Sequence, residues 1–145
     1  MKILFKKVCI GSDHAGYNLK EIIKNFLITK NISIFDLGPM NENSVDYPDY
    51  AKKVSNRVKS NNSDVGILIC GSGTGMAISA NKIKGIRAAV CYNLKSTRLS
   101  RLHNNANIIA LGSRFIKKKM ALKLVSIFLE TKFEGGRHLR RVKKI

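Results

Sequence analysis

A reactive side chain and a candidate anion-binding loop stand together in mid-chain, where Cys70 is followed directly by Gly-Ser-Gly-Thr-Gly. The uncharged run 66–69 before it is rich in β-branched residues, as is typical of a strand buried on both faces of a parallel sheet. The loop glycines Gly71, Gly73 and Gly75 free the backbone to turn tightly and aim several N–H groups at one point. With a helix beginning directly after the loop, the pattern favours a negatively charged oxygen and predicts a reaction site.

Two familiar nucleotide-binding motifs do not fit this loop. It lacks the Lys-Ser/Thr ending of a P-loop, and its glycine spacing differs from the Gly-x-Gly-x-x-Gly of dinucleotide-binding folds. Cysteine is also commonly a small buried hydrophobic residue, and we assign that role to Cys9 and Cys91. Cys70 differs because it lies where a strand ends, and the ligand crevice of an open α/β sheet lies at the carboxyl ends of its strands.

Strand-like and helical segments alternate along the chain. The hydrophobic pattern predicts strands at 7–11, 32–37, 65–70, 87–91 and 107–111. It predicts helices at 17–27, 47–59, 74–82, 95–104 and 115–130, followed by a basic helical tail from about residue 136. Such alternation is typical of a parallel sheet covered by helices. We therefore expect residues 1–145 to form a single α/β domain, a three-layer αβα Rossmann-like fold with a five-stranded parallel sheet.

Polar residues follow several of the predicted strands. Asp13 and His14 come after the first strand, Cys70 and its glycine loop end the third, and Arg114 comes after the fifth. Because the carboxyl ends of parallel strands share one edge of the sheet, these groups would face one cleft. A carboxylate, an imidazole, a thiol and an anion-binding loop form the inventory of a proton-transfer enzyme.

Two of the candidates also have simpler explanations. Asp13 is well placed to cap the helix behind it, although the adjacent His14 doubles the ionisable groups at the cleft and favours a functional role. His103 lies near the end of a predicted helix, where a surface imidazole interacts favourably with the helix dipole. For His103 the residues alone leave both interpretations open.

A pair of arginines in the basic tail is spaced for a phosphate. Arg137 and Arg141 are four residues apart, so a helix would present both guanidinium groups on one face. Such groups bind phosphate through bidentate, charge-assisted hydrogen bonds, whereas we interpret Lys143 and Lys144 as solvated surface charge. Two glycines before the tail would let it fold back toward a cleft. The implied ligand is a small phosphorylated molecule.

The formal net charge of +18 raises the question of a nucleic-acid partner. Lysines supply most of the positive charge and are scattered along the chain, and aromatic residues are not interleaved with them to stack on bases. We therefore expect weak, salt-sensitive association with polyanions and no specific nucleic-acid partner.

The apolar runs, the start of the chain and the cysteines indicate the cellular compartment in which the protein is expected. No apolar run approaches the roughly 20 residues of a membrane span, so we expect no membrane partner. The first ten residues lack the features of a signal peptide. Three irregularly spaced cysteines predict neither a disulfide framework nor a zinc site. A reducing cytoplasm is the expected location.

The chain resembles the ribose-5-phosphate isomerase B family along nearly its whole length. The resemblance rests on seven motifs in order: Gly-Ser-Asp-His-Ala-Gly at 11–16, Asp-Tyr-Pro-Asp-Tyr-Ala at 46–51, Ile-Cys-Gly-Ser-Gly-Thr-Gly at 69–75, Ala-Asn-Lys at 80–82, Gly-Ile-Arg-Ala at 85–88, Leu-Ser-Arg-Leu-His-Asn at 99–104 and Glu-Gly-Gly-Arg-His at 134–138. No single motif is decisive, but seven in order are highly specific.

The resemblance implies an aldose-ketose isomerase that interconverts D-ribose 5-phosphate and D-ribulose 5-phosphate through a cis-enediolate, in the non-oxidative pentose phosphate pathway. It implies no metal and no organic cofactor. Cys70 matches the base of one family branch, whereas the other branch has glycine there and a glutamate six residues later, where this chain has Met76. Ser72 stands where that cysteine branch often has threonine, and either hydroxyl could hydrogen-bond the sugar or the thiol.

The resemblance also assigns the remaining roles. His103 and Asp13 match the positions associated with opening of the furanose ring. Arg137 and Arg141 match the phosphate-binding arginines. Further matches are His14 and Arg114 as helpers at the phosphate, and Tyr47 and Asn81 near the sugar and the loop. The family implies a homodimer, or a dimer of dimers, in which the partner subunit contributes His103 and Asn104.

Two other functions remain open on the sequence. One is isomerisation of a hexose 6-phosphate such as allose or galactose 6-phosphate, because related proteins share this scaffold and the motifs do not reveal pocket depth. The other is a non-catalytic phosphosugar or nucleotide sensor. A sensor would need the anion-binding loop and the arginines, but not Cys70 together with His103.

Overall fold

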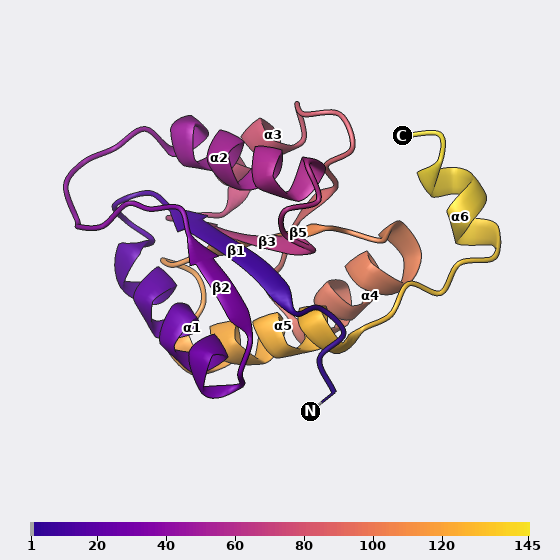
Figure 1. Ribbon diagram of the computed structural model, residues 1–145, viewed down its shortest axis with the longest axis horizontal. Helices are drawn as coiled ribbons and strands as arrows, with labels where there is room; N and C mark the ends of the chain where they lie inside the picture. Colours follow the sequence, from indigo (N-terminus) through magenta and orange to yellow (C-terminus); the bar gives the residue numbers. More distant parts are fainter. Residues whose placement is uncertain (1) are drawn as a thin grey trace.

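The computed structural model describes residues 2–145 and forms a parallel sheet flanked by helices (Figure 1). The strands are β1 (Lys7–Ser12), β2 (Ser33–Asp36), β3 (Val65–Cys70), β4 (Ala88–Val90) and β5 (Ile108–Gly112). The helices are α1 (Tyr17–Thr29), α2 (Tyr47–Lys59), α3 (Thr74–Ala80), α4 (Leu94–Asn104), α5 (Lys118–Glu130) and α6 (Arg137–Val142). The prediction of a five-stranded parallel sheet with helices on both sides is confirmed.

The strand order places the first and third strands side by side at the centre. The order is β2-β1-β3-β5-β4, and each neighbouring pair is parallel. After β1 the chain moves outward to β2 and then crosses to β3 on the other side, so the topology reverses between β1 and β3. A crevice opens at such a switch point, outside the carboxyl ends of the two strands. Asp13 and Cys70 lie at those ends.

Two hydrophobic cores lie on opposite faces of the sheet because alternate strand residues point to opposite sides. Val8 and Ile10 of β1 belong to the core that packs against α1 and α5, whereas Cys9 between them belongs to the core that packs against α2 and α3. All six residues of β3 are buried. Figure 1 shows α2 and α3 above the sheet and α1, α4 and α5 below it.

The structure shifts several predicted boundaries, most clearly in the helix expected at 115–130. That helix begins at Lys118, three residues later than predicted. Phe115 lies outside it, is 68% exposed and packs edge-on against the ring of Tyr92, with 6.2 Å between centroids. The apolar side chain at 115 fits the helical pattern by spacing, but here it borders the crevice. The other differences are of one or two residues at element ends, such as α3 ending at Ala80.

A buried lysine ties the end of β2 to α1. Lys20 is fully buried, and its Nζ lies 2.7 Å from Asp36 Oδ2 and 2.9 Å from Glu21 Oε1. Lys24 contacts the same two carboxylates at 2.9 and 2.8 Å. Burial alone would raise the pKa of Asp36, but hydrogen bonds from the two lysines and from the Gly38 N–H lower it below its ordinary value.

Replacing this carboxylate is expected to weaken the fold in a pH-dependent way. Because the folded-state pKa of Asp36 lies below the unfolded one, its stabilising effect is present above pH 4 and is lost as the pH falls further. Asp36→Asn should lower the free energy of unfolding by about 2–3 kcal/mol at pH 7, since it removes a partner of a buried cation. Urea unfolding between pH 3 and 7 measures the effect, with the exposed Glu42→Gln as the control. Equal losses for both variants, or a loss that does not shrink between pH 7 and pH 3, would contradict the role given to this pair.

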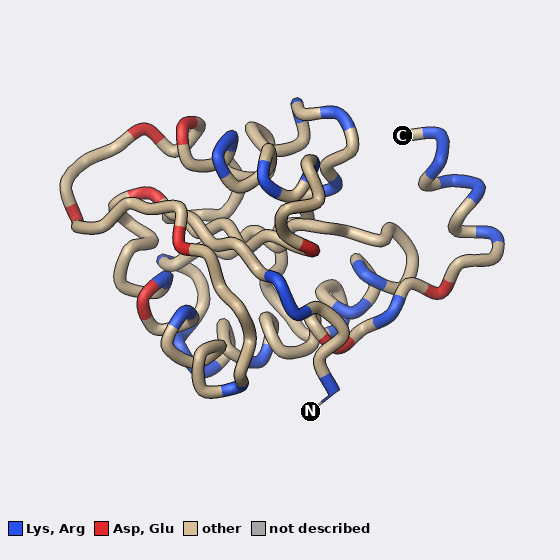
Figure 2. Tube along the Cα trace, in the orientation of Figure 1, with Lys and Arg blue, Asp and Glu red and all other residues tan. Residues whose placement is uncertain are grey.

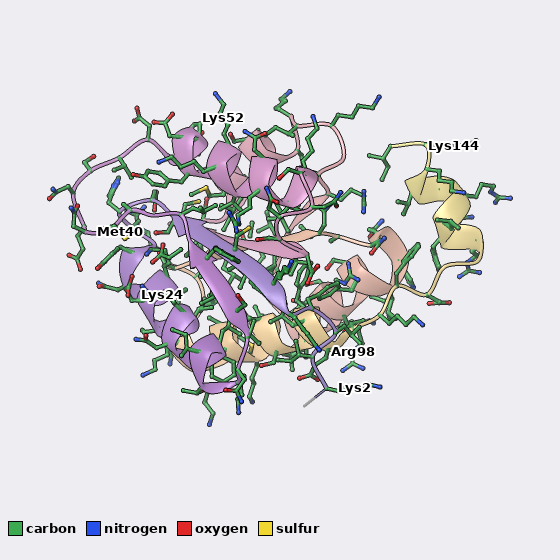
Figure 3. All side chains as sticks on the ribbon, in the orientation of Figure 1. Lys2, Lys24, Met40, Lys52, Arg98 and Lys144 are labelled. Atoms are coloured by element: carbon green, nitrogen blue, oxygen red, sulfur yellow. The ribbon has the colours of Figure 1, made fainter. Side chains whose placement is uncertain are left out.

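Basic residues are spread along the whole trace, and α6 carries several of them (Figure 2). Acidic residues gather in the loop before α2 and at its start, at Glu42, Asp46 and Asp49. Long side chains such as Lys52 and Lys144 extend outward (Figure 3), as expected of solvated surface charge. Within residues 2–145, none of the helices is both long enough and apolar enough to cross a membrane.

Candidate active site

A pocket of about 320 Å³ lies at the switch point between β1 and β3. Its lining consists of Asp13, Tyr47, Cys70, Gly71, Ser72, Gly75, Arg114 and Phe115. Seven of these eight residues were predicted from the sequence as site residues. The fold brings them together from the segments that follow three strands and from the start of α2. Phe115 is the addition that the structure makes.

The thiol of Cys70 is held by the loop that follows it. The Gly73 N–H donates a hydrogen bond to Cys70 Sγ at 3.1 Å, and Cys70 is only 5% exposed. The next N–H, of Thr74, donates to Ser72 Oγ at 3.2 Å. The sequence predicts that the loop N–H groups converge on a ligand; instead, two of them contact the thiol and the neighbouring hydroxyl.

The loop glycines allow close packing by two side chains. A Cβ on Gly71 would lie 2.8 Å from Arg114 Nη1, so the guanidinium rests against the loop backbone. A Cβ on Gly75 would lie 2.8 Å from the Tyr47 ring, which therefore forms the wall above the start of α3. Substituting either glycine would displace these groups. The glycines are needed here mainly for close approach, and Gly73 also adopts a left-handed φ of 79°.

Tyr92 braces the loop from the segment after β4, which is separated from β3 by β5 in the sheet. Its hydroxyl donates to the Ser72 carbonyl at 2.7 Å, and its ring packs against Phe115. Both residues follow strands of the sheet, so the strand-end rule could have identified them. The brace depends on contact between two aromatic rings, which the position of each residue after its strand does not reveal.

Asp13 lines the pocket and closes the turn before α1, but it is not the N-cap of that helix, which is Gly16. Its Oδ1 accepts a hydrogen bond from the Gly16 N–H at 2.9 Å, which closes the turn before α1. The Asp13 N–H donates to the Ile69 carbonyl at 3.1 Å, which ties the carboxylate to β3 one residue before Cys70. Asp13 is 8% exposed and lines the pocket. The turn thus fixes a carboxylate beside the thiol.

His14 does not line this pocket in the single chain. It is exposed, and its Nδ1 accepts a hydrogen bond from the Val45 N–H at 3.2 Å, in the loop before α2. Asn81 holds backbone, because its side chain donates to the Ala88 carbonyl at 2.9 Å and accepts from the Ala88 N–H at 2.7 Å. These contacts place His14 against the loop before α2 and Asn81 against the first residue of β4, where it lines a different pocket together with Asn104.

The remaining predicted residues form a second group at the opposite edge of the sheet. Helix α4 starts beyond the carboxyl end of β4 and runs back, so His103 and Asn104 lie near the amino end of β5. The strand between the two edges is five residues long, which spans roughly 16 Å. His103, Asn104 and Arg141 line a separate pocket of about 450 Å³.

Helix α6 lies beside this second group and not over Cys70 of the same chain. The Glu134 N–H donates to the Leu102 carbonyl at 3.1 Å, which fixes the linker before α6 against the end of α4. In Figure 1, α6 extends from the body at the α4 end. The tail therefore does not fold back to the cleft at Cys70 within one chain, and Arg141 lines the pocket at His103 instead. Arg137 and Arg141 are both exposed.

Two histidines and a glutamate of the second group lie within 4.8 Å of one another. The Nε2 atoms of His103 and His138 lie 3.9 and 4.0 Å from the two carboxylate oxygens of Glu134. Such a set could ligate a metal ion, but the imidazole rings are stacked at 4.2 Å with only 11° between their planes. Ring-nitrogen lone pairs lie in the ring plane, so here they run parallel and do not converge on one ion.

Loss of solvation lowers the pKa of His138, and the positive charges of His103, Arg137 and Arg141 lower it further, against the opposing effect of Glu134. The sequence analysis did not assign a role to Glu134 or His138. The sequence did offer a signal for them: Glu134 and His138 are four residues apart, in the same motif as the candidate phosphate ligand Arg137.

The other two cysteines are unlike Cys70. Burial raises the pKa of Cys9 to about 11, and burial also raises that of Cys91. Both are packed in hydrophobic cores, as the sequence analysis expects, and neither lines the pocket, whereas Cys70 contacts one of these cores and also lines the pocket. Neutral, enclosed thiols of this kind are inert.

Comparisons with known proteins give a consistent result. A family model described as Ribose/Galactose Isomerase matches residues 8–145. Ribose-5-phosphate isomerase B of Escherichia coli (strain K12) is 43% identical over 140 residues, which are 97% of this chain and 94% of that protein.

Solved structures agree with the sequence comparison. Ribose-5-phosphate isomerase B of Clostridium thermocellum superposes with a TM-score of 0.94 at 51% identity, covering 95% of this chain and 93% of that one. The enzyme of that name from Mycoplasma genitalium, solved with bound ribulose-5-phosphate, has a TM-score of 0.91 at 47% identity, covering 94% of this chain and 91% of that one.

Proposed function

Because this chain belongs to the ribose/galactose isomerase family, we propose that it interconverts D-ribose 5-phosphate and D-ribulose 5-phosphate, with Cys70 as the proton-transferring base. The observation that carries the assignment is the buried thiol, which receives the Gly73 N–H and shares its pocket with the carboxylate of Asp13. The pentose substrate is supported by the relatives named ribose-5-phosphate isomerase B and by the bound ribulose-5-phosphate in one of them.

The first step is opening of the furanose ring. The C1 hydroxyl loses its proton, the bond between C1 and the ring oxygen breaks, C1 becomes an aldehyde, and the ring oxygen gains a proton. His103 and Asp13 serve this exchange together, one group near each oxygen. A positioned acid and base typically contribute 10²- to 10⁴-fold to such a step.

The second step moves one proton between neighbouring carbons. The Cys70 thiolate takes the proton from C2, the electrons of that C–H bond form a double bond between C1 and C2, and negative charge develops on O1. The proton then returns to C1, O2 gives up its hydrogen as C2 becomes the ketone, and O1 gains one. Substrate and product have the same atoms and the same overall oxidation state, so the reaction needs no redox cofactor.

Charge on the enediolate is stabilised by groups on the same loop. The Ser72 hydroxyl accepts the Thr74 N–H and keeps its own hydrogen free to donate to a sugar oxygen. The Arg114 guanidinium rests on Gly71 and adds positive charge at the pocket. Preorganised donors of this kind can be worth roughly 10²- to 10³-fold each.

We propose that the site is completed across a homodimer. Within one chain, the Cys70 pocket and the His103 group lie at opposite edges of the sheet, so one sugar cannot contact both. A two-fold partner that presents its α4 end and α6 to the Cys70 pocket would supply His103, Asn104 and two phosphate-binding arginines, Arg137 and Arg141. His14, which is exposed and follows the pocket residue Asp13 in the chain, would face the incoming phosphate. Two such dimers could pair as a tetramer.

The test is an isomerase assay on ribose 5-phosphate in the presence of EDTA. We expect ribulose 5-phosphate to form at the same rate with and without the chelator, because every proposed step uses side chains and backbone N–H groups of the chain. Loss of activity that added metal restores would overturn the mechanism. Absence of isomerisation, with retained binding of the sugar phosphate, would favour the non-catalytic sensor.

The choice of sugar is tested with the same preparation. We expect kcat/KM for ribose 5-phosphate to exceed that for allose 6-phosphate and galactose 6-phosphate. A clear preference for either hexose phosphate would overturn the pentose assignment. We further propose a reducing, cytoplasmic location, since the catalytic thiol must stay unoxidised.

A further inference from the structure

His138 is buried without an evident structural reason. Its side chain is 8% exposed, and among residues 2–145 its Nε2 atom has no hydrogen-bond partner. Burying an unpartnered polar atom costs free energy, and such an atom in a folded protein calls for an explanation. The Glu134 carboxylate is at 4.0 Å, too far for a hydrogen bond.

The contact that His138 does make is with the ring of His103. The two imidazoles are stacked with centroids 4.2 Å apart and planes 11° apart. They belong to different helices, α4 and α6, so the stack couples the orientation of one ring to the position of the other helix. The linker is fixed as well, because the Glu134 N–H donates to the carbonyl of Leu102, the residue before His103.

A stack of this kind restricts the motion that a solvent-facing histidine otherwise has. The His103 side chain is 38% exposed, and the χ2 torsion of histidine is broad and roughly two-fold. A flat ring on one face limits rotation about that torsion. The Glu134 carboxylate lies 3.9 Å from His103 Nε2 and favours the ring orientation in which Nε2 faces the carboxylate.

We propose that His138 is a positioning residue for His103, which it holds by stacking in the orientation needed for ring opening. This inference rests on the proposed function, in which His103 serves the furanose-opening step. His138 contacts the ring of His103 and needs no contact with the sugar. Its hydrogen-bonding capacity is not used, so a flat apolar ring should replace it.

The experiment compares His138→Ala with His138→Phe, using Lys143→Ala at the exposed end of α6 as the control. We expect His138→Ala to lower kcat for ribose 5-phosphate by about 10- to 100-fold with KM changed less than about threefold, because misplacing a catalytic group by an ångström can cost 10²-fold. His138→Phe keeps the stack and should retain kcat within about threefold of the wild type. Lys143→Ala should match the wild type.

A second readout separates ring opening from proton transfer. Ribulose 5-phosphate cannot close to a furanose, since the oxygen that would close the ring carries the phosphate. Exchange of its C1 hydrogen with D₂O, followed by NMR, therefore needs Cys70 but no ring opening. His138→Ala should retain this exchange within about threefold of the wild type, which also shows that the variant is folded.

Each result decides between the alternatives. A wild-type kcat in His138→Ala overturns the proposal. An equal loss of kcat in His138→Ala and His138→Phe also overturns it, because it would show that the imidazole nitrogens of His138 are needed and not only its flat ring. Loss of C1 exchange in His138→Ala also overturns it, by placing the defect outside ring opening. If the wild type catalyses neither isomerisation nor exchange, the proposed function fails.

Discussion

Cys70→Ala is expected to lower kcat for ribose 5-phosphate by at least about 10³-fold, because it removes the group that carries the proton between C1 and C2. Exchange of the C1 hydrogen of ribulose 5-phosphate with D₂O should be lost to the same extent. Binding should change little, since the arginines and the loop backbone remain. Isothermal titration with ribose 5-phosphate is expected to give a Kd within about fivefold of the wild type, as for a loss confined to the transition state.

The matched control is Cys91→Ala, which removes another buried thiol of the same chain. Cys91 is packed in the hydrophobic core and does not line the Cys70 pocket. The kcat of Cys91→Ala for ribose 5-phosphate should therefore stay near that of the wild type. Normal isomerisation by Cys70→Ala would show that the base has been assigned to the wrong residue. Loss of activity in both variants would point to a packing effect.

Two inactive variants are expected to restore activity when combined in one dimer. Cys70→Ala damages one half of the proposed shared site, and His103→Ala damages the half that the partner supplies. In a mixed dimer, one of the two sites receives both intact halves. Random assembly of equal amounts makes half the dimers mixed, so about 25% of wild-type activity should return. The measurement is kcat per chain after co-expression, compared with each parent.

The control for this experiment pairs Cys70→Ala with Asp13→Asn. Both residues line the same pocket of one chain, so each site of a mixed dimer carries one of the two substitutions and activity should not return. Activity of the Cys70→Ala and His103→Ala mixture equal to the mean of its parents would show that each site is built within one chain. The shared-site proposal would then be wrong.

The residues at the ends of β1 and β3 were accessible from the sequence. Short β-branched runs followed by turn and polar residues mark strands that end at a ligand-binding edge, and this rule places Asp13 beside Cys70. It succeeds because hydrophobic periodicity is a local property, and because alternation of strands and helices makes the strands parallel, so that their carboxyl ends share one edge. The helix expected at 115–130 shows the limit, since the spacing of Phe115 fits a helix although the residue packs against Tyr92.

The chain by itself determined the fold class, the thiol at the edge of the sheet and the glycine loop that follows it; that Arg114 and Tyr47 pack against Gly71 and Gly75 came from the tertiary structure. Only the tertiary structure decided that the Gly73 N–H contacts the Cys70 sulfur and that His103 stacks on His138 at the other edge. These contacts depend on the direction in which α4 and α6 leave the sheet. Linear spacing does not encode that direction, because contacts between residues distant in the chain fix it.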